Sequence, residues 1–80
     1  MIKAEDIKGY NELDKVSQKV LIQFWYEFNI AHEKETREHI KPICVKACCE
    51  IGYGEYIRFD YTYFEDERWV HVKDHPIMWF

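Results

Sequence analysis

The stretch YIRFDYTYFEDERWVHV, residues 56–72, decides the expected fold because two alternating segments flank a run of three acids. Apolar residues occupy every second position from residue 57 to residue 63, and a period of two is typical of a β-strand. Residues 69–73 alternate again. We therefore expect an antiparallel hairpin, whose inward positions are Ile57, Phe59, Tyr61, Tyr63, Val70 and Val72.

One register brings the apolar positions of both strands together, and it places the turn at residues 65–68. It sets Tyr63 opposite Val70 on the inner face and Phe64 opposite Trp69 on the outer face. Aromatic cross-strand pairs contribute roughly 0.2–1 kcal/mol each. A slip of one residue would exchange the two faces and turn charged side chains inward, so the pattern specifies this register well.

The three acids Glu65, Asp66 and Glu67 lie at the expected hairpin tip, where side chains are solvated. A solvated carboxyl group is poorly placed to act as a general acid, because that role needs an environment that shifts its pKa. One interpretation is a charged turn that limits aggregation at the sheet edge. The other is a contact for a basic surface of a protein partner.

Residues 12–32 show helical spacing of apolar side chains, and Asn11 is a favoured N-cap residue. We expect a long amphipathic helix whose buried stripe holds Leu13, Val16, Val20, Phe24, Phe28 and Ala31. Its back carries Ile22, Tyr26 and Ile30, four residues apart, where a surface helix is normally polar. Either the helix is central, with layers on two sides, or this stripe binds a partner.

The segment IKPICVKACCEIG, residues 40–52, has two interpretations. Its apolar residues recur at intervals of three and four, Pro42 suits a first helical turn, and Gly52 suits the position after a helix. These features favour a second helix at residues 42–51. The alternative is a buried strand, because β-branched residues such as Val45 are common in strands.

The final residues, HPIMWF, contain Pro76, which disfavours a central strand. They cover the core or form an edge strand in one interpretation and dock on a partner in the other. The expected fold is α+β: one long amphipathic helix and a shorter second helix packed on an antiparallel β-hairpin or a small three-stranded sheet, in a single domain of residues 1–80. The expected core is Leu13, Val20, Phe24, Phe28, Ile43, Ala47, Ile57, Phe59, Tyr61, Val70 and Val72.

Composition and charge exclude several classes of function. The net charge of −4 and the absence of a basic segment disfavour direct binding to nucleic acid, which needs clustered Lys and Arg. No signal peptide or apolar run of about 20 residues is visible, so we expect no membrane contact. Three Cys, an odd number, fit a reducing compartment, and we expect a cytoplasmic protein.

The thiols offer the clearest candidate for metal chemistry. Cys44 and Cys48, four residues apart, would share one helix face, and a zinc set would need ligands from His32, His39, His71 or His75. The spacing matches no standard zinc module, and free Cys is among the most buried residue types. We therefore expect core thiols, no metal, no cofactor and no enzymatic activity.

The leading hypothesis is a small noncatalytic protein-binding module, an inhibitor or modulator that occupies a surface of a larger protein, for which a nucleic-acid-handling protein is one candidate, or that forms a homodimer. Aromatic residues near acids favour it, because Tyr, Trp and Phe are enriched at binding cores. The expected protein-binding residues are Ile22, Tyr26, Ile30, Phe64, Glu65, Asp66, Glu67, Trp69 and Trp79.

Two alternatives differ in class from this hypothesis. One is a winged-helix DNA-binding regulator with residues 42–51 as its recognition helix, or a sheet on which Phe59 and Tyr61 stack on bases. The residues of that helix are poor partners for base edges, and the hairpin tip would present Glu65 and its acidic neighbours to phosphates. The other is a small zinc or thiol protein.

Overall fold

A four-stranded antiparallel sheet with one long helix on one face makes up the computed structural model, which describes residues 2–74 and 76–80. The α+β class predicted from the sequence is confirmed. In chain order the elements are the 3-10 turns η1 (Ala4–Asp6) and η2 (Tyr10–Glu12), the helices α1 (Lys15–Ile30) and α2 (Lys34–Arg37), and the strands β1 (Ile40–Glu50), β2 (Gly54–Tyr63), β3 (Asp66–Lys73) and β4 (Met78–Trp79).

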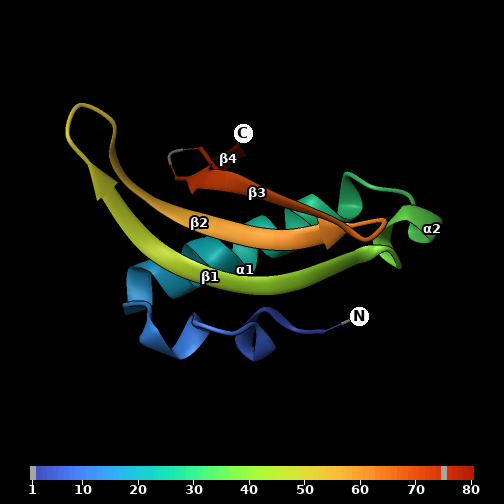
Figure 1. Ribbon diagram of the computed structural model, residues 1–80. Helices are drawn as coiled ribbons and strands as arrows, with labels where there is room; N and C mark the ends of the chain where they lie inside the picture. Colours follow the sequence, from blue (N-terminus) through green and yellow to red (C-terminus); the bar gives the residue numbers. More distant parts are fainter. Residues whose placement is uncertain (1, 75) are drawn as a thin grey trace.

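The strands lie in the order β1-β2-β3-β4, so each strand pairs with its neighbour in the chain. Helix α1 crosses one face of the sheet, and Figure 1 shows no other element of the described chain on the opposite face. An antiparallel sheet tolerates this arrangement, because its outward side chains can be polar while its inward side chains form the core. We call the uncovered side the open face.

Helix α1 begins later than expected, and Asp14 rather than Asn11 is its N-cap residue. The Asp14 carboxylate accepts a hydrogen bond from the backbone N–H of Ser17 at 2.7 Å. This bond holds the pKa of Asp14 below its ordinary value, because it stabilises the ionised form. Asn11 lies instead within η2, one turn before the helix.

The buried face of α1 consists of Leu21, Phe24, Trp25, Phe28 and Asn29. On its back, the exposed fractions of Ile22, Tyr26 and Ile30 are 42%, 60% and 57%. The interpretation of α1 as a central helix with layers on two sides is therefore wrong, and the apolar stripe on its back faces solvent.

Residues 40–50 form strand β1, so the prediction of a helix at residues 42–51 is wrong and the alternative of a strand is correct. The pairing of β1 with β2 shifts between Pro42 and Cys44, which leaves Ile43 as the extra residue of a β-bulge. The bulge turns both Ile40 and Val45 toward α1, although they are five residues apart. The second helix is α2, a single turn in the charged segment before β1.

The β2–β3 hairpin has a two-residue turn at Phe64 and Glu65, not the expected four-residue turn. Both turn residues adopt positive φ, 50° and 71°, as in the tight turns whose twist matches that of the flanking strands. The expected partner of Tyr63 is Val70, whereas its observed partner is Asp66. A shift of four residues preserves the side-chain faces, so the inward assignment of β2 is correct while the register is wrong.

The carboxy-terminal residues pack on the core as an edge strand. β4 pairs with β3, and the Trp79 ring lies 5.5 Å from that of Phe24. Two residues of the expected core are exposed: Ile43 is the extra residue of the β-bulge, and Ala47 lies toward the far end of β1. The others are buried or packed against the core: Leu13, Val20, Phe24, Phe28, Ile57, Phe59, Tyr61, Val70 and Val72.

The amino-terminal segment covers the outer edge of β1 (Figure 1). The backbone N–H of Val45 donates to the carbonyl oxygen of Lys8 at 2.9 Å. The indole N–H of Trp25 donates to the carbonyl oxygen of Ile2 at 3.0 Å. These bonds satisfy donors that would otherwise lie at an unpaired strand edge or in the core.

Candidate functional site

The open face carries a cluster of aromatic rings that the sequence analysis did not assemble. Side chains alternate between the faces of a strand, so the residues between the buried positions of β2 and β3 point away from α1. The turn after β1 and the last residue of the chain add one ring each. We call this cluster the aromatic platform, and it consists of Tyr53, Tyr56, Trp69, His71 and Phe80.

His71 lies at the centre of the platform. Its ring centroid is 4.1 Å from that of Tyr56, 4.7 Å from that of Trp69 and 5.4 Å from that of Tyr53. The backbones of His71 and Phe80 exchange two hydrogen bonds, of 2.9 and 3.1 Å, which place Phe80 beside the platform. Three of the five rings therefore lie on paired strands, and Phe80 is held beside them by backbone hydrogen bonds.

The rings of the platform differ in their exposure. Tyr56 is buried, with 8% of its surface exposed, whereas Trp69 is 50% exposed and Phe80 is 58% exposed. Tyr56 is therefore the innermost ring of the platform, and Trp69 and Phe80 present apolar surface to solvent. A large apolar patch with polar neighbours is typical of a binding surface.

Two cations lie against these rings. The Arg58 guanidinium carbon is 4.8 Å from the Trp69 ring centroid, and its Nε is 3.1 Å from Oδ1 of Asp60. The ammonium nitrogen of Lys73 is 4.0 Å from the Tyr53 ring centroid. Cation–π contacts at such distances contribute roughly 0.5–1 kcal/mol each at exposed sites. They limit the rotamers of Trp69 and Tyr53 before any partner binds.

A hydrogen bond from the Tyr56 hydroxyl fixes the lower edge of the platform. The hydroxyl donates to a carboxylate oxygen of Glu50 at 2.7 Å. This bond, together with desolvation, raises the pKa of Tyr56 well above its ordinary range. Tyr56 therefore stays neutral, and Glu50 is engaged within the chain.

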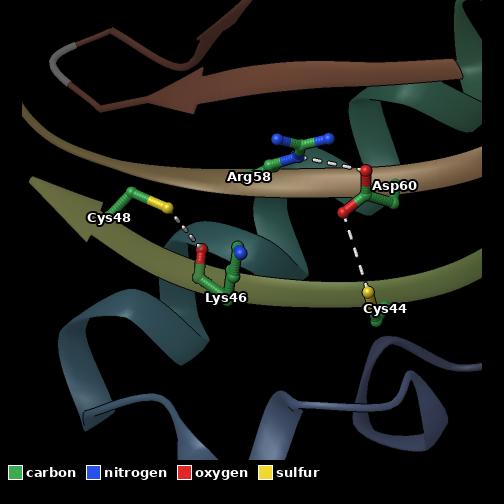
Figure 2. A network of polar contacts seen from close by, with 5 residues as sticks. All are labelled: Cys44, Lys46, Cys48, Arg58 and Asp60. Atoms are coloured by element: carbon green, nitrogen blue, oxygen red, sulfur yellow. Dashed lines mark hydrogen bonds and ion pairs between the residues drawn. The ribbon is translucent and has the colours of Figure 1, made fainter.

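The thiols lie on β1 beside the platform, and Figure 2 shows their polar contacts. The Cys44 thiol donates to Oδ2 of Asp60 at 3.6 Å, and desolvation and the Asp60 charge raise its pKa. A protonated thiol is a poor nucleophile and a poor metal ligand. Cys44 and Cys48 are half-buried on a strand rather than buried in a helix, so the prediction of core thiols is wrong.

The strand geometry also separates the thiols from one another. Four residues of a strand span about 13 Å, which is too far for Cys44 and Cys48 to bind one zinc ion. Within residues 2–74 and 76–80, no group of three or more His, Cys, Asp or Glu residues is arranged to hold a metal ion. His75, a candidate ligand in the sequence, lies outside the described residues.

The acidic tip, Glu65, Asp66 and Glu67, joins the platform along β3. All three side chains are exposed. Glu67 and Trp69 are two residues apart and therefore lie on the same face of β3, so the acidic tip is adjacent to the aromatic platform. The tip itself is held by Phe64, whose ring stacks 4.3 Å from that of His39.

The structure separates the residues that the sequence analysis assigned to one binding surface. Trp69 and Glu67 lie on the open face, with the other acids and Phe64 at the adjacent tip. The stripe of Ile22, Tyr26 and Ile30 lies on the back of α1, on the opposite side of the molecule. Trp79 is half-buried and packs on the core side of the sheet.

Sequence reasoning missed five residues of this surface: Tyr53, Tyr56, Arg58, His71 and Phe80. The alternation of β2 does place Arg58 outward, but the wrong register paired His71 with Thr62 instead of Arg58. The sequence allowed an edge strand at the final residues but did not fix its register, so the position of Phe80 beside His71 was not predicted.

Charges on the open face nearly balance, which bears on the kind of partner. By the pairing of the strands, four cations and three acids lie there: Lys41, Lys46, Arg58, Lys73, Glu50, Asp60 and Glu67. A surface that replaces the counterions of nucleic acid needs clustered cations in clear excess. Phe59 and Tyr61, the proposed base-stacking residues, are buried under α1, and the proposed recognition helix is strand β1.

No protein-family model matches the chain, and no curated protein or solved structure shows significant similarity to it. The helices of the described residues lack the combination of length and apolar character that a membrane span requires. Function is therefore inferred from the surface chemistry of the chain itself.

Proposed function

We propose that this chain is a noncatalytic protein-binding module that docks its open face on a larger protein and thereby inhibits or modulates it. The observation that carries the proposal is the uncovered sheet face with its aromatic platform. Aromatic and Arg side chains supply most binding energy at protein interfaces. Trp69 and Phe80 are the expected anchors, because they are the most exposed rings of the platform.

The size of the open face constrains the complex. Four strands spaced about 4.8 Å apart and about eight residues of 3.3 Å give a face of roughly 500 Å². A standard interface buries about 800 Å² on each partner. The partner must therefore contact more than the platform, and the acidic tip is the adjacent surface that extends it.

The acidic tip indicates the chemistry of the partner. Its carboxylates are solvated and lie beside the rings, so they can steer association with a basic surface without a large desolvation cost. We expect the partner to present an apolar patch next to basic groups, as the cleft of a nucleic-acid-handling protein does. The three free thiols fit a reducing compartment, so we expect the cytoplasm as the site of action.

Affinity capture with matched variants tests the proposal. The wild-type chain is immobilised beside Trp69→Ala, which removes a platform ring, and Tyr26→Ala, which removes an equally exposed ring from the back of α1. We expect one protein to bind the wild type and Tyr26→Ala, and to be lost with Trp69→Ala. Adding Glu67→Gln is expected to slow association and to weaken its dependence on salt.

Three outcomes would overturn the proposal. Equal capture by all variants would show that the open face is not the interface. Loss with Tyr26→Ala alone would move the interface to α1, and retention of oligonucleotides in place of protein would indicate a nucleic-acid-binding sheet. Sedimentation of the purified chain detects a homodimer through the same face, which Trp69→Ala would then dissociate.

A further inference from the structure

A groove lies at the junction of the amino-terminal segment, α1, α2 and the start of β1. Its volume is about 610 Å³. Pockets for small molecules have volumes of about 300–1,000 Å³ and mostly apolar walls with a few placed polar groups. The residues of this groove follow that division.

The floor of the groove is apolar and rigid. Trp25 and Ile40 contribute to it, and each is only 6% exposed because it also belongs to the core. The indole N–H of Trp25 already donates to the carbonyl oxygen of Ile2, so the ring presents carbon atoms to the groove. Ile2 adds an apolar wall that is 44% exposed.

The rim of the groove is basic, although the chain as a whole is acidic. Lys34, Arg37 and Lys41 line it, with Glu38 as the one acid, so the rim carries +2 in a chain of net charge −4. Glu33 and Glu35 are near in sequence but are not part of the lining. An anion is therefore favoured at this rim, although the net charge of the chain is negative.

One hydrogen bond restrains the Arg37 guanidinium at the rim. Its Nε donates to the carbonyl oxygen of His32 at 2.8 Å. Within the described residues this is the only hydrogen bond of the guanidinium, so its two terminal nitrogens are left for a ligand. A guanidinium fork binds a carboxylate through two parallel hydrogen bonds.

We propose that this groove binds a small amphipathic carboxylate, a molecule with an apolar chain on the Trp25–Ile40 floor and a carboxylate at Arg37, Lys34 and Lys41. The apolar floor favours the apolar chain of the ligand, and the basic rim favours its carboxylate. The site is independent of the aromatic platform, and its ligand regulates or accompanies the module without replacing its protein partner.

Calorimetry with three probes of equal chain length tests the charge requirement. Decanoate, decanol and decyltrimethylammonium are titrated into the full chain below their micelle-forming concentrations. We expect decanoate to bind at least about tenfold more tightly than decanol, because its carboxylate accepts charge-assisted hydrogen bonds at the rim that a hydroxyl group does not. We expect no measurable binding of the cation.

Two substitutions that each remove one positive charge test the position of the site. Arg37→Gln is expected to remove most of the preference for decanoate over decanol, whereas Lys46→Gln on the open face is expected to leave it unchanged. In an amide-proton spectrum, decanoate is expected to shift the Trp25 indole signal and not that of Trp69. Far-ultraviolet circular dichroism confirms that both variants are folded.

Equal affinity for decanoate and decanol, an Arg37→Gln variant that binds like the wild type, or ligand-induced shifts on the aromatic platform would each overturn the proposal. Absence of binding by every probe would overturn it as well. None of these outcomes bears on the capture experiment, because Trp69→Ala does not touch the groove. Failure of either proposal is therefore distinguishable from failure of the other.

Discussion

At the scale of single residues, the β2–β3 turn holds an unusual conformation. Phe64 and Glu65 have φ of 50° and 71°, a left-handed region that costs an L-residue roughly 1–2 kcal/mol. Phe64 is compensated, because its N–H donates to the carbonyl oxygen of His39 at 3.1 Å and its ring stacks on His39. Within the described residues Glu65 makes no hydrogen bond or ring contact that would offset this cost.

Glu65→Gly is expected to stabilise the chain by about 0.5–1 kcal/mol, because the relief of strain exceeds the entropy that glycine gains in the unfolded state. Urea denaturation measures the change. Asp66→Gly is the control, because Asp66 does not have positive φ and glycine should destabilise the strand there. If both variants lose stability equally, Glu65 does not have the left-handed conformation assigned to it. With a partner identified, Glu65→Gly is expected to bind it more weakly despite the gain in stability.

At the scale of elements, β1 shows why the local spacing of apolar residues predicted a helix where the chain forms a strand. Its apolar residues recur at intervals of three and four, which favours a helix, but Ile43, Ala47 and Ile51 of that pattern are exposed. The buried residues are Ile40 and Val45, five residues apart across the bulge at Ile43. Ten pairs with β2 decide the outcome, and such long-range pairing overrides local propensity. A bulge leaves no reliable signal in one sequence, so the phase of β1 could not be read from its residues.

Other elements were predictable because one physical signal dominates each of them. Helix α1 follows from an apolar period of 3.6, and the inward face of β2 follows from a period of two. The register of the hairpin did not follow, because Phe64 and Glu65 are not residues that favour a left-handed turn. Trp69 and the acids were therefore predicted as surface residues, while the platform around His71 was not.

The docking of the amino-terminal segment on β1 depends on Gly9. Its φ is 97°, and an added Cβ would lie 2.1 Å from the carbonyl oxygen of Val45. Gly52 also has positive φ, 83°, but an added Cβ there meets no atom within 4 Å. Substitution of Gly52 by alanine therefore measures the cost of positive φ alone, and substitution of Gly9 adds the cost of a clash with the backbone of Val45.

Gly52→Ala is expected to cost about 1 kcal/mol, from conformation alone. Gly9→Ala is expected to cost about 3 kcal/mol, because overpacking against a backbone atom adds to the same strain. Thermal or urea unfolding of the two variants measures the difference. Similar losses in both would show that the segment is not packed on β1, and hydrogen exchange at the Val45 amide, which donates to Lys8, would then be fast in the wild type.

At the scale of the whole molecule, one layer of aromatic side chains between α1 and the sheet forms the core. Phe24 has no exposed surface, and its ring contacts those of Phe28, Phe59 and Trp79 at centroid distances of 5.1–5.5 Å. A chain of 80 residues has a total stability of only about 4–12 kcal/mol. Loss of one central ring is therefore a large fraction of the stability that keeps both surfaces in place.

Phe24→Ala is expected to cost about 3–5 kcal/mol and to bring the chain close to unfolding at room temperature. Tyr26→Ala, two residues away on the same helix and 60% exposed, is expected to change stability by less than about 0.5 kcal/mol. Circular dichroism in the near and far ultraviolet, followed through urea denaturation, measures both. A Tyr26→Ala loss as large as that of Phe24→Ala would mean that the back of α1 is covered by a second layer or a second chain. Because one side of α1 and one side of the sheet are free in this fold, the difference between the two variants tests the architecture on which both proposed binding surfaces depend.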